Sequence, residues 1–118
     1  MWEVRFDDEF IAELSNEPVS IRRHVAMLAQ LLAESGPQLS RPYCDTLKGS
    51  RFPNMKELRF SEMDEVWRIA FAFDPERRAI LLVGGDKAGM SQRRFYRALI
   101  QRADERFQRH LDAIREGR

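Results

Sequence analysis

The chain has 118 residues, of which 43% are hydrophobic and 33% are charged, a balance typical of one folded domain and not of a disordered segment. Its single cysteine, Cys44, excludes an internal disulfide and a four-cysteine zinc site. No apolar run approaches the ~20 residues that span a bilayer, and the N-terminus lacks the features of a signal peptide. We therefore expect a single domain over residues 1–118 that works in the cytoplasm without a membrane contact.

The formal net charge of +1 conceals an uneven distribution of charge along the chain. Residues 1–20 contain six acidic residues against one arginine, whereas residues 41–60 and 84–102 are both basic. The two basic stretches would form an anion-binding surface if the fold brings them together. The plainer interpretation is that each basic stretch is a solvated face.

The N-terminal third of the chain predicts one strand and two helices. Apolar and polar residues alternate over residues 2–6, which is typical of a half-buried strand. The acidic residues 7–9 favour the start of a short helix, because the helix dipole stabilises negative charge there, and Pro18 ends that helix. A second helix fits residues 19–35 and stops at residues 36–37, a Gly-Pro pair. Its apolar face consists of Ile21, Val25, Leu28 and Leu32.

The middle of the chain predicts a loop followed by three strands. Residues 36–54 contain three prolines and favour a long ordered loop, which in a compact domain is usually functional or mobile. Residues 55–60 and 65–73 have alternating patterns and are joined by the acidic turn 61–64, which predicts a hairpin. Residues 79–83 are apolar throughout, as expected of a central strand that is covered on both faces.

Ser91 is expected to cap a final helix over residues 92–114. The predicted order of elements is therefore β-α-α-β-β-β-α. Because helices and strands do not alternate in this order, it favours an α+β fold. We expect a small, mostly antiparallel sheet packed with two N-terminal helices and a C-terminal helix. The apolar ladder of that last helix consists of Phe95, Leu99, Ala103, Phe107, Leu111 and Ile114.

Two arginines of the predicted hairpin are candidate phosphate ligands. Arg59 and Arg68 have the same outward parity on adjacent strands, so they should be neighbours on one face. Ala70 and Ala72 share that face and would leave room above the sheet for a phosphate, which the planar guanidinium group binds well. The alternative is that Glu57 pairs with Arg68 across the hairpin and that no binding site exists.

Other polar residues are weaker candidates taken singly. Lys87 follows the central strand, and the adjacent Asp86 could act as a base or pair with a lysine. Tyr96 could stack on a base or donate a proton, or it could be a tyrosine at the edge of the core. Loops and strand ends often carry binding residues on a rigid scaffold. By that criterion the further cationic candidates are Lys48, Arg51, Lys56, Arg93 and Arg94.

The sequence offers no pattern for a metal or a nucleotide cofactor. His24 and His110 are far apart and lack metal-ligand spacing with another histidine or cysteine, so we interpret both as structural. Residues 84–87 do not have the spacing of a phosphate-binding P-loop, and no nucleophile elbow is present. We expect no metal and no cofactor.

A series of short motifs runs along nearly the whole chain. These motifs are L-K-G at 47–49, K-E-L-R at 56–59, W-R-I at 67–69, the apolar strand at 80–82, D-K at 86–87, and R-F-Y and A-D-E-R-F at 94–96 and 103–107. In their order and spacing these motifs resemble toxins of the RelE/ParE superfamily, and they are most similar to its HigB-like branch, which includes phage-derived relatives.

The resemblance implies that the chain is the toxin of a type II toxin–antitoxin system. Such a toxin would cleave mRNA as an endoribonuclease, usually at the ribosome, and a small antitoxin, often a helix-turn-helix protein, would neutralise it. Arg59, Arg68, Lys48 and Lys87 would line the RNA site, and the other basic candidates would contact RNA.

Cleavage by the 2′-hydroxyl needs a base, an acid for the leaving oxygen, and cations for the charge on the phosphate. Several ribonucleases of the superfamily place histidines in the site, whereas this chain has none in the loop or in the last strand. Asp86, Lys87 or Tyr96 would then transfer protons, or the ribosome would contribute. Two other functions remain open. One is a ParE-like toxin that binds DNA gyrase without catalysis, and the other is a plain RNA- or protein-binding module.

Overall fold

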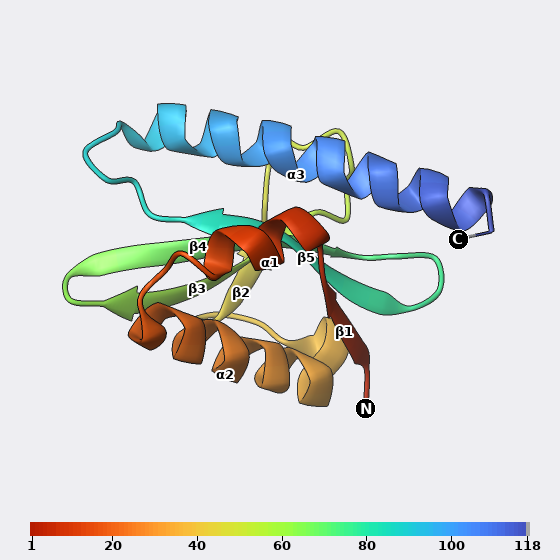
Figure 1. Cartoon of the computed structure of the whole chain (residues 1–118), viewed down its shortest axis with the longest axis horizontal. Helices are drawn as coiled ribbons and strands as arrows, with labels where there is room; N and C mark the ends of the chain where they lie inside the picture. Colours follow the sequence, from red (N-terminus) through yellow and green to blue (C-terminus); the bar gives the residue numbers. More distant parts are fainter. Residues whose placement is uncertain (118) are drawn as a thin grey trace.

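The computed structural model describes residues 1–117, and it arranges them as a five-stranded sheet with helices on both faces (Figure 1). This architecture confirms the predicted α+β class. None of the helices in the described part of the chain has the length and apolar character that crossing a membrane requires. The elements are β1 (Glu3–Phe6), α1 (Asp8–Leu14), α2 (Val19–Ser35), the short 3-10 helix η1 (Gly36–Gln38), β2 (Cys44–Thr46), β3 (Lys56–Glu62), β4 (Glu65–Phe73), β5 (Arg78–Gly85) and α3 (Gln92–Arg115).

The prediction of an unbroken loop over residues 36–54 is wrong. The segment contains η1 and the three-residue strand β2, which pairs antiparallel with β3 and brings Cys44 opposite Leu58. The strand order is β1-β5-β4-β3-β2, with β1 parallel to β5 and the remaining pairs antiparallel. Three residues are too few to show an alternating pattern, so β2 leaves no signal in the sequence.

Local chemistry explains where the helices begin and end. The Asp7 carboxylate accepts hydrogen bonds from the backbone amides of Glu9 and Phe10, at 3.0 and 3.3 Å, and so caps α1. The Ser91 hydroxyl caps α3 by accepting from the Arg94 amide at 3.2 Å, as predicted. Helix α2 ends at Ser35 because the next residue, Gly36, has a φ of 58° and an added Cβ there would overlap the indole ring of Trp2.

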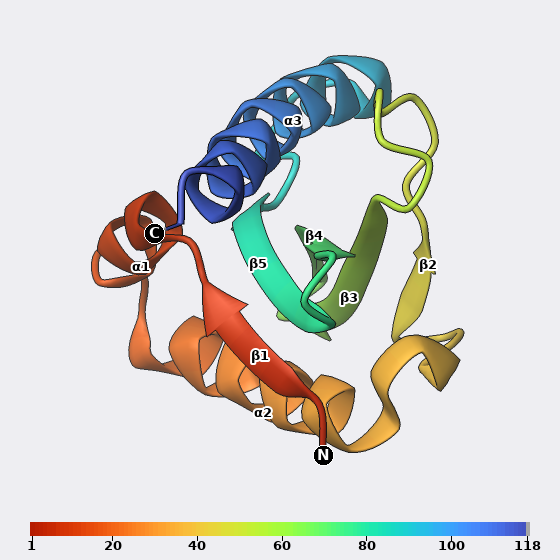
Figure 2. The same ribbon diagram turned by 90° about the vertical axis from the view of Figure 1, so that its right-hand side faces the viewer.

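The sheet separates two apolar cores. The view in Figure 2 shows α2 and α3 on opposite sides of the sheet. Helix α2 buries its predicted apolar face on one side of the sheet, and α3 covers the other side. Ala70 and Ala72 are 0% exposed in the second core. The expectation that these alanines leave an open floor for a phosphate is therefore wrong. Small side chains at these positions instead let α3 approach the sheet closely.

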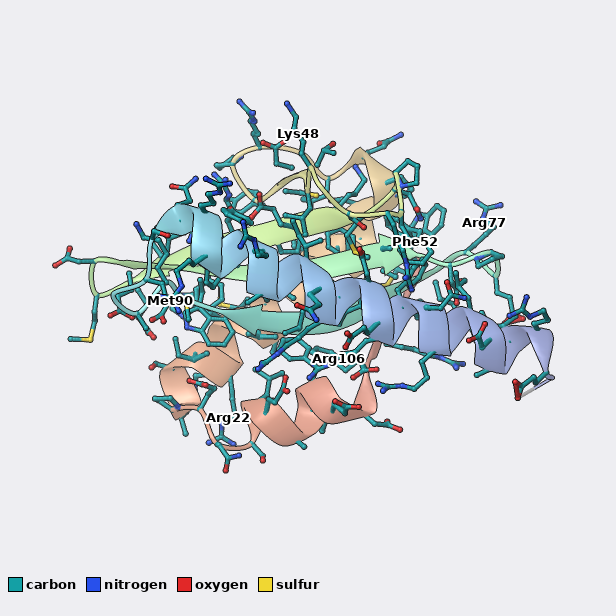
Figure 3. The ribbon with its side chains drawn as sticks, turned by 90° about the horizontal axis from the view of Figure 1, so that it is seen from above. Arg22, Lys48, Phe52, Arg77, Met90 and Arg106 are labelled. Atoms are coloured by element: carbon teal, nitrogen blue, oxygen red, sulfur yellow. The ribbon has the colours of Figure 1, made fainter. Side chains whose placement is uncertain are left out.

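The acidic N-terminal stretch is used within the fold. Arg106 of α3 is 6% exposed and points toward α1, as seen from above in Figure 3. Its guanidinium group donates to both carboxylate oxygens of Glu13, at 2.9 and 2.5 Å, and to the Leu82 carbonyl at 2.8 Å. Glu9 and Asp7 lie 3.3 and 3.8 Å from the same side chain. These contacts hold α1 against α3.

Candidate functional site

The β3–β4 hairpin brings two arginines together. Arg59 and Arg68 are direct cross-strand partners, which confirms the prediction that they share one face. The strands extend to Glu62 and Glu65, and a turn at residues 63–64 joins them with φ angles of 48° and 68°. Positive φ at both central residues suits the twist of a two-residue hairpin. The register that this turn sets therefore places the arginine pair.

A buried carboxylate lies beside the arginine pair. Glu57 is only 4% exposed, and its Oε1 accepts a hydrogen bond from the Tyr96 hydroxyl at 2.8 Å. Nη2 of Arg59 lies 3.4 Å from the other carboxylate oxygen, and Nε of Arg68 lies 4.0 Å from Oε1. The predicted alternative, a Glu57–Arg68 pair, is thus present as a long ion pair within a cluster of four residues. We call Glu57, Arg59, Arg68 and Tyr96 the Glu57 cluster.

The two guanidinium groups of this cluster have unused hydrogen-bonding capacity. The Nε atoms of Arg59 and Arg68 are both buried and have no hydrogen-bond partner. The Arg68 residue as a whole is 8% exposed, and its guanidinium carbon lies 5.5 and 5.3 Å from the ring centroids of Phe95 and Tyr96. Buried donors without a partner are rare in folded proteins. Their presence here favours an anion as the missing acceptor.

The cluster also shifts the acidity of its members. Burial raises the pKa of the Tyr96 hydroxyl, and the adjacent Glu57 carboxylate raises it further. The hydrogen bond with Tyr96 raises the pKa of Arg59, and the Glu57 charge has the same effect. At neutral pH, Tyr96 therefore keeps its proton and Arg59 keeps its positive charge.

The Glu57 cluster opens into a hollow of about 590 Å³ on the α3 side of the hairpin. Lys48 and Gln92 also line this space, which we call the Lys48 hollow. The loop that carries Lys48 is fixed to α3, because the Ser50 hydroxyl and the Arg51 amide both donate to the Asp104 carboxylate. The L-K-G loop and the first turns of α3 therefore enclose the hairpin arginines from two sides.

Lys87 lies in a different hollow. It lines a space of about 370 Å³ together with Arg68, Glu65 and Asp86, between the hairpin turn and the segment after β5. The hydrogen bond and the negative charge of Asp86 raise the pKa of Glu65. Asp86 thus interacts with a second carboxylate, whereas the sequence had led us to consider only a base or a lysine partner. Arg68 is the residue shared between this hollow and the Glu57 cluster.

The remaining cationic candidates are dispersed. Arg51 lies on the loop fixed to α3, with its guanidinium group 3.5 Å from the Asp104 carbonyl. Lys56 is opposite Phe71 in the β3–β4 register, on the α2 side of the sheet and away from the arginine pair. Arg93 and Arg94 are exposed on the first turn of α3. The fold thus brings Lys48, Arg59, Arg68 and Tyr96 close together and leaves these four cations on the periphery.

Sequence reasoning missed Glu57 as a site residue, although the signal was available. Glu57, Arg59 and Arg68 share one parity, so the same alternation that paired the arginines also places the carboxylate beside them. The sequence could not show that Tyr96, which lies 39 residues further along the chain in α3, donates a hydrogen bond to this carboxylate.

Both histidines form contacts within the fold. His24 stacks on Phe60 with ring centroids 4.8 Å apart, and His110 pairs with the Asp74 carboxylate at 2.8 Å. Among residues 1–117, no group of three or more histidine, cysteine, aspartate or glutamate side chains is placed to hold a metal ion.

Comparisons with known proteins agree with this architecture. Residues 12–108 match the family of phage-derived Gp49-like proteins (DUF891). The fold is similar to that of a mutant of the E. coli toxin RelE in the free state, with a TM-score of 0.61, 12% sequence identity, and coverage of 84% of this chain and 93% of RelE.

Two curated relatives come from Mycobacterium tuberculosis. The chain is 49% identical over 83 residues to putative toxin HigB2 and 51% identical over 87 residues to putative toxin HigB3. These alignments cover 70% and 74% of this chain, but 41% of HigB2 and 74% of HigB3. The chain therefore belongs to the Gp49-like family and to its HigB-like relatives, and it shares its fold with RelE.

Proposed function

We propose that the chain is the toxin of a type II toxin–antitoxin system and that it inhibits translation in the cytoplasm by cutting mRNA. The observation that carries this proposal is the Glu57 cluster, in which two arginines with buried Nε atoms that lack a hydrogen-bond partner flank a carboxylate and a protonated tyrosine. Guanidinium groups of this kind stabilise the charge that develops on a phosphate during cleavage.

The cluster supplies the groups that cleavage by the 2′-hydroxyl requires. The Glu57 carboxylate takes the proton of the 2′-hydroxyl as the 2′-oxygen bonds to phosphorus. As the bond to the 5′-oxygen breaks, Tyr96 donates its proton to that oxygen and recovers one from Glu57 through their 2.8 Å hydrogen bond. The products are a 2′,3′-cyclic phosphate and a 5′-hydroxyl end. Arg59 and Arg68 hold the phosphate, and no metal is needed.

The dispersed cations have a second role in this proposal. Lys48 and Lys87 approach the RNA from the two hollows beside Arg68, while Arg51, Lys56, Arg93 and Arg94 contact RNA phosphates at the periphery. Cations spread over a surface strengthen binding to nucleic acid without selecting a sequence. Dependence on the ribosome follows if ribosomal RNA occupies these outer positions. The cognate antitoxin, which we propose is of the helix-turn-helix type, neutralises the toxin.

Mapping of mRNA 5′ ends in a cell-free translation reaction tests the proposal. We expect new ends with the wild-type protein, and the same ends with Arg22→Ala, which removes an exposed arginine on the opposite helix. Arg59→Ala should produce none of these ends. Repeating the reaction without ribosomes shows whether they are required. Intact mRNA in the presence of folded wild-type protein would contradict the proposal and favour a gyrase-directed toxin or a binding module.

A further inference from the structure

An apolar groove lies on the opposite side of the molecule from α3, between α2 and the β2–β3 edge of the sheet. Its volume is about 480 Å³, and we call it the α2 groove. Two of its side chains are large, apolar and strongly exposed: Met27 is 67% exposed and Tyr43 is 46% exposed. Leu28, Leu31 and Phe60 also line it.

The grouping of these side chains distinguishes the α2 groove from ordinary surface exposure. Single exposed apolar residues are normal, and Ile11 and Met63 are examples at 52% and 90% exposure that line none of the hollows described above. A contiguous apolar groove with a polar rim is typical of a protein-binding surface. Strand β2 begins only at Cys44, and the last backbone contact along this edge of β3 is the hydrogen bond from the Arg59 amide to the Tyr43 carbonyl at 2.9 Å.

One residue connects the α2 groove to the Glu57 cluster. Arg59 lines both the groove and the Lys48 hollow. Its side chain is 42% exposed, and its Nε is a buried donor without a partner. The guanidinium group lies on the α3 face beside Glu57, so an occupant of the groove that continues around the edge of the sheet would bring a carboxylate to this charge. An occupant with apolar side chains and one acidic side chain thus fits the chemistry of the whole surface.

We propose that the α2 groove docks a segment of the cognate antitoxin, which covers Met27 and Tyr43 with apolar side chains and pairs a carboxylate with Arg59. This inference rests on the proposed function in that it assumes an antitoxin. RNA fits the surface poorly, because the groove is apolar and its rim includes the Glu34 carboxylate. A second copy of the chain also fits poorly, since much of its acidic N-terminal stretch is already paired with α3. An antitoxin carboxylate paired with Arg59 would prevent this arginine from binding RNA, so antitoxin binding would itself neutralise the toxin.

Substitution of an exposed groove residue tests the docking site without touching the Glu57 cluster. Met27→Lys should weaken binding of the purified cognate antitoxin by about 100-fold or more, because it places a charge where an apolar side chain of the antitoxin should pack. Ile11→Lys is the matched control, an equally drastic change at an exposed position on another helix, and it should bind normally. In cells, Met27→Lys should arrest growth even when the antitoxin is co-expressed.

Hydrogen–deuterium exchange of the wild-type complex provides a second readout. Antitoxin binding should slow exchange in residues 24–34 and 59–61 and leave residues 8–14 unchanged. Normal binding by Met27→Lys together with unchanged exchange in residues 24–34 would overturn the inference. It would also be overturned if Met27→Lys lost self-association and not antitoxin binding, which would assign the groove to a second copy.

These outcomes separate the inference from the proposed function. Weaker antitoxin binding by Met27→Lys would support the docking site even if the wild-type protein cut no mRNA. In that case the ribonuclease proposal alone would fail.

Discussion

Two buried arginines in this protein have opposite surroundings. Arg106 and Arg68 are almost equally buried, at 6% and 8% exposure. Arg106 donates three hydrogen bonds of 2.9 Å or less, to one carboxylate and one backbone carbonyl. Arg68 has one long hydrogen bond, 3.4 Å to the Val66 carbonyl, and its Nε has no hydrogen-bond partner. Burial alone therefore does not show whether the fold supplies a buried cation with hydrogen-bond acceptors.

The difference lies in how completely the fold satisfies each charge. A buried guanidinium group is tolerated when nearby acceptors replace the water that it lost, as Glu13 and Leu82 do for Arg106. The fold leaves Arg68 short of acceptors and stacks it over two aromatic rings that fix its orientation. An arginine held in this way is prepared for an acceptor from outside the chain, and the proposed acceptor is an RNA phosphate.

The largest expected effect is on mRNA cleavage. Arg68→Ala should reduce mRNA cleavage by about 10²–10³-fold, because it removes a preorganised cation from the reacting phosphate. Its free energy of unfolding should change by less than about 1 kcal/mol, since the removed group makes no strong hydrogen bond. Cleavage assays and urea unfolding measure the two quantities. Cleavage at the wild-type rate would remove Arg68 from the site.

Arg106→Ala should have the opposite result, a loss of stability without a loss of mRNA cleavage. Arg106→Ala should lower the free energy of unfolding by about 3 kcal/mol, because it leaves the clustered carboxylates of α1 without their cation. Under conditions where the variant is folded, it should still cleave mRNA. The control is Arg97→Ala, an exposed arginine on the same helix, which should leave stability unchanged. Equal stability of the two variants would show that Arg106 does not hold α1 to α3.

A smaller effect concerns the pH dependence of the α1–α3 contact. The hydrogen bond from Arg106 lowers the pKa of Glu13 below its ordinary value of 4.5. A carboxyl group with a lowered pKa stabilises the fold above its ordinary pKa, and this contribution is lost as the pH falls through the folded-state pKa. Wild type should therefore be more stable than Glu13→Gln at neutral pH, and the difference should shrink as the pH falls below the ordinary pKa of 4.5. Urea unfolding across this range measures it. A difference independent of pH would mean that Glu13 contributes through packing and not through charge.

The sequence predictions were correct where the signal lies within one helix or strand, and wrong where it depends on packing between elements far apart in the chain. The helix over residues 19–35 was predicted with the bounds of α2, because a Gly-Pro stop and a regular apolar face are local signals. The parity of Arg59 and Arg68 also held, because alternation along a strand is local. The prediction of open space above Ala70 and Ala72 was wrong. The alternating pattern of the hairpin predicted that this face points outward, but α3 packs on it.

The sequence by itself determined the type and order of most elements, the resemblance to the HigB-like branch, and the face on which the two arginines meet. These features depend on residue spacing within one element or between neighbours in the chain. Only the tertiary structure decided that Tyr96 caps Glu57, that Lys87 lies in a separate hollow, and that Arg106 pairs with the acidic N-terminal stretch. Those contacts join residues far apart in the chain, and their positions follow from how α1 and α3 pack, which no local pattern encodes.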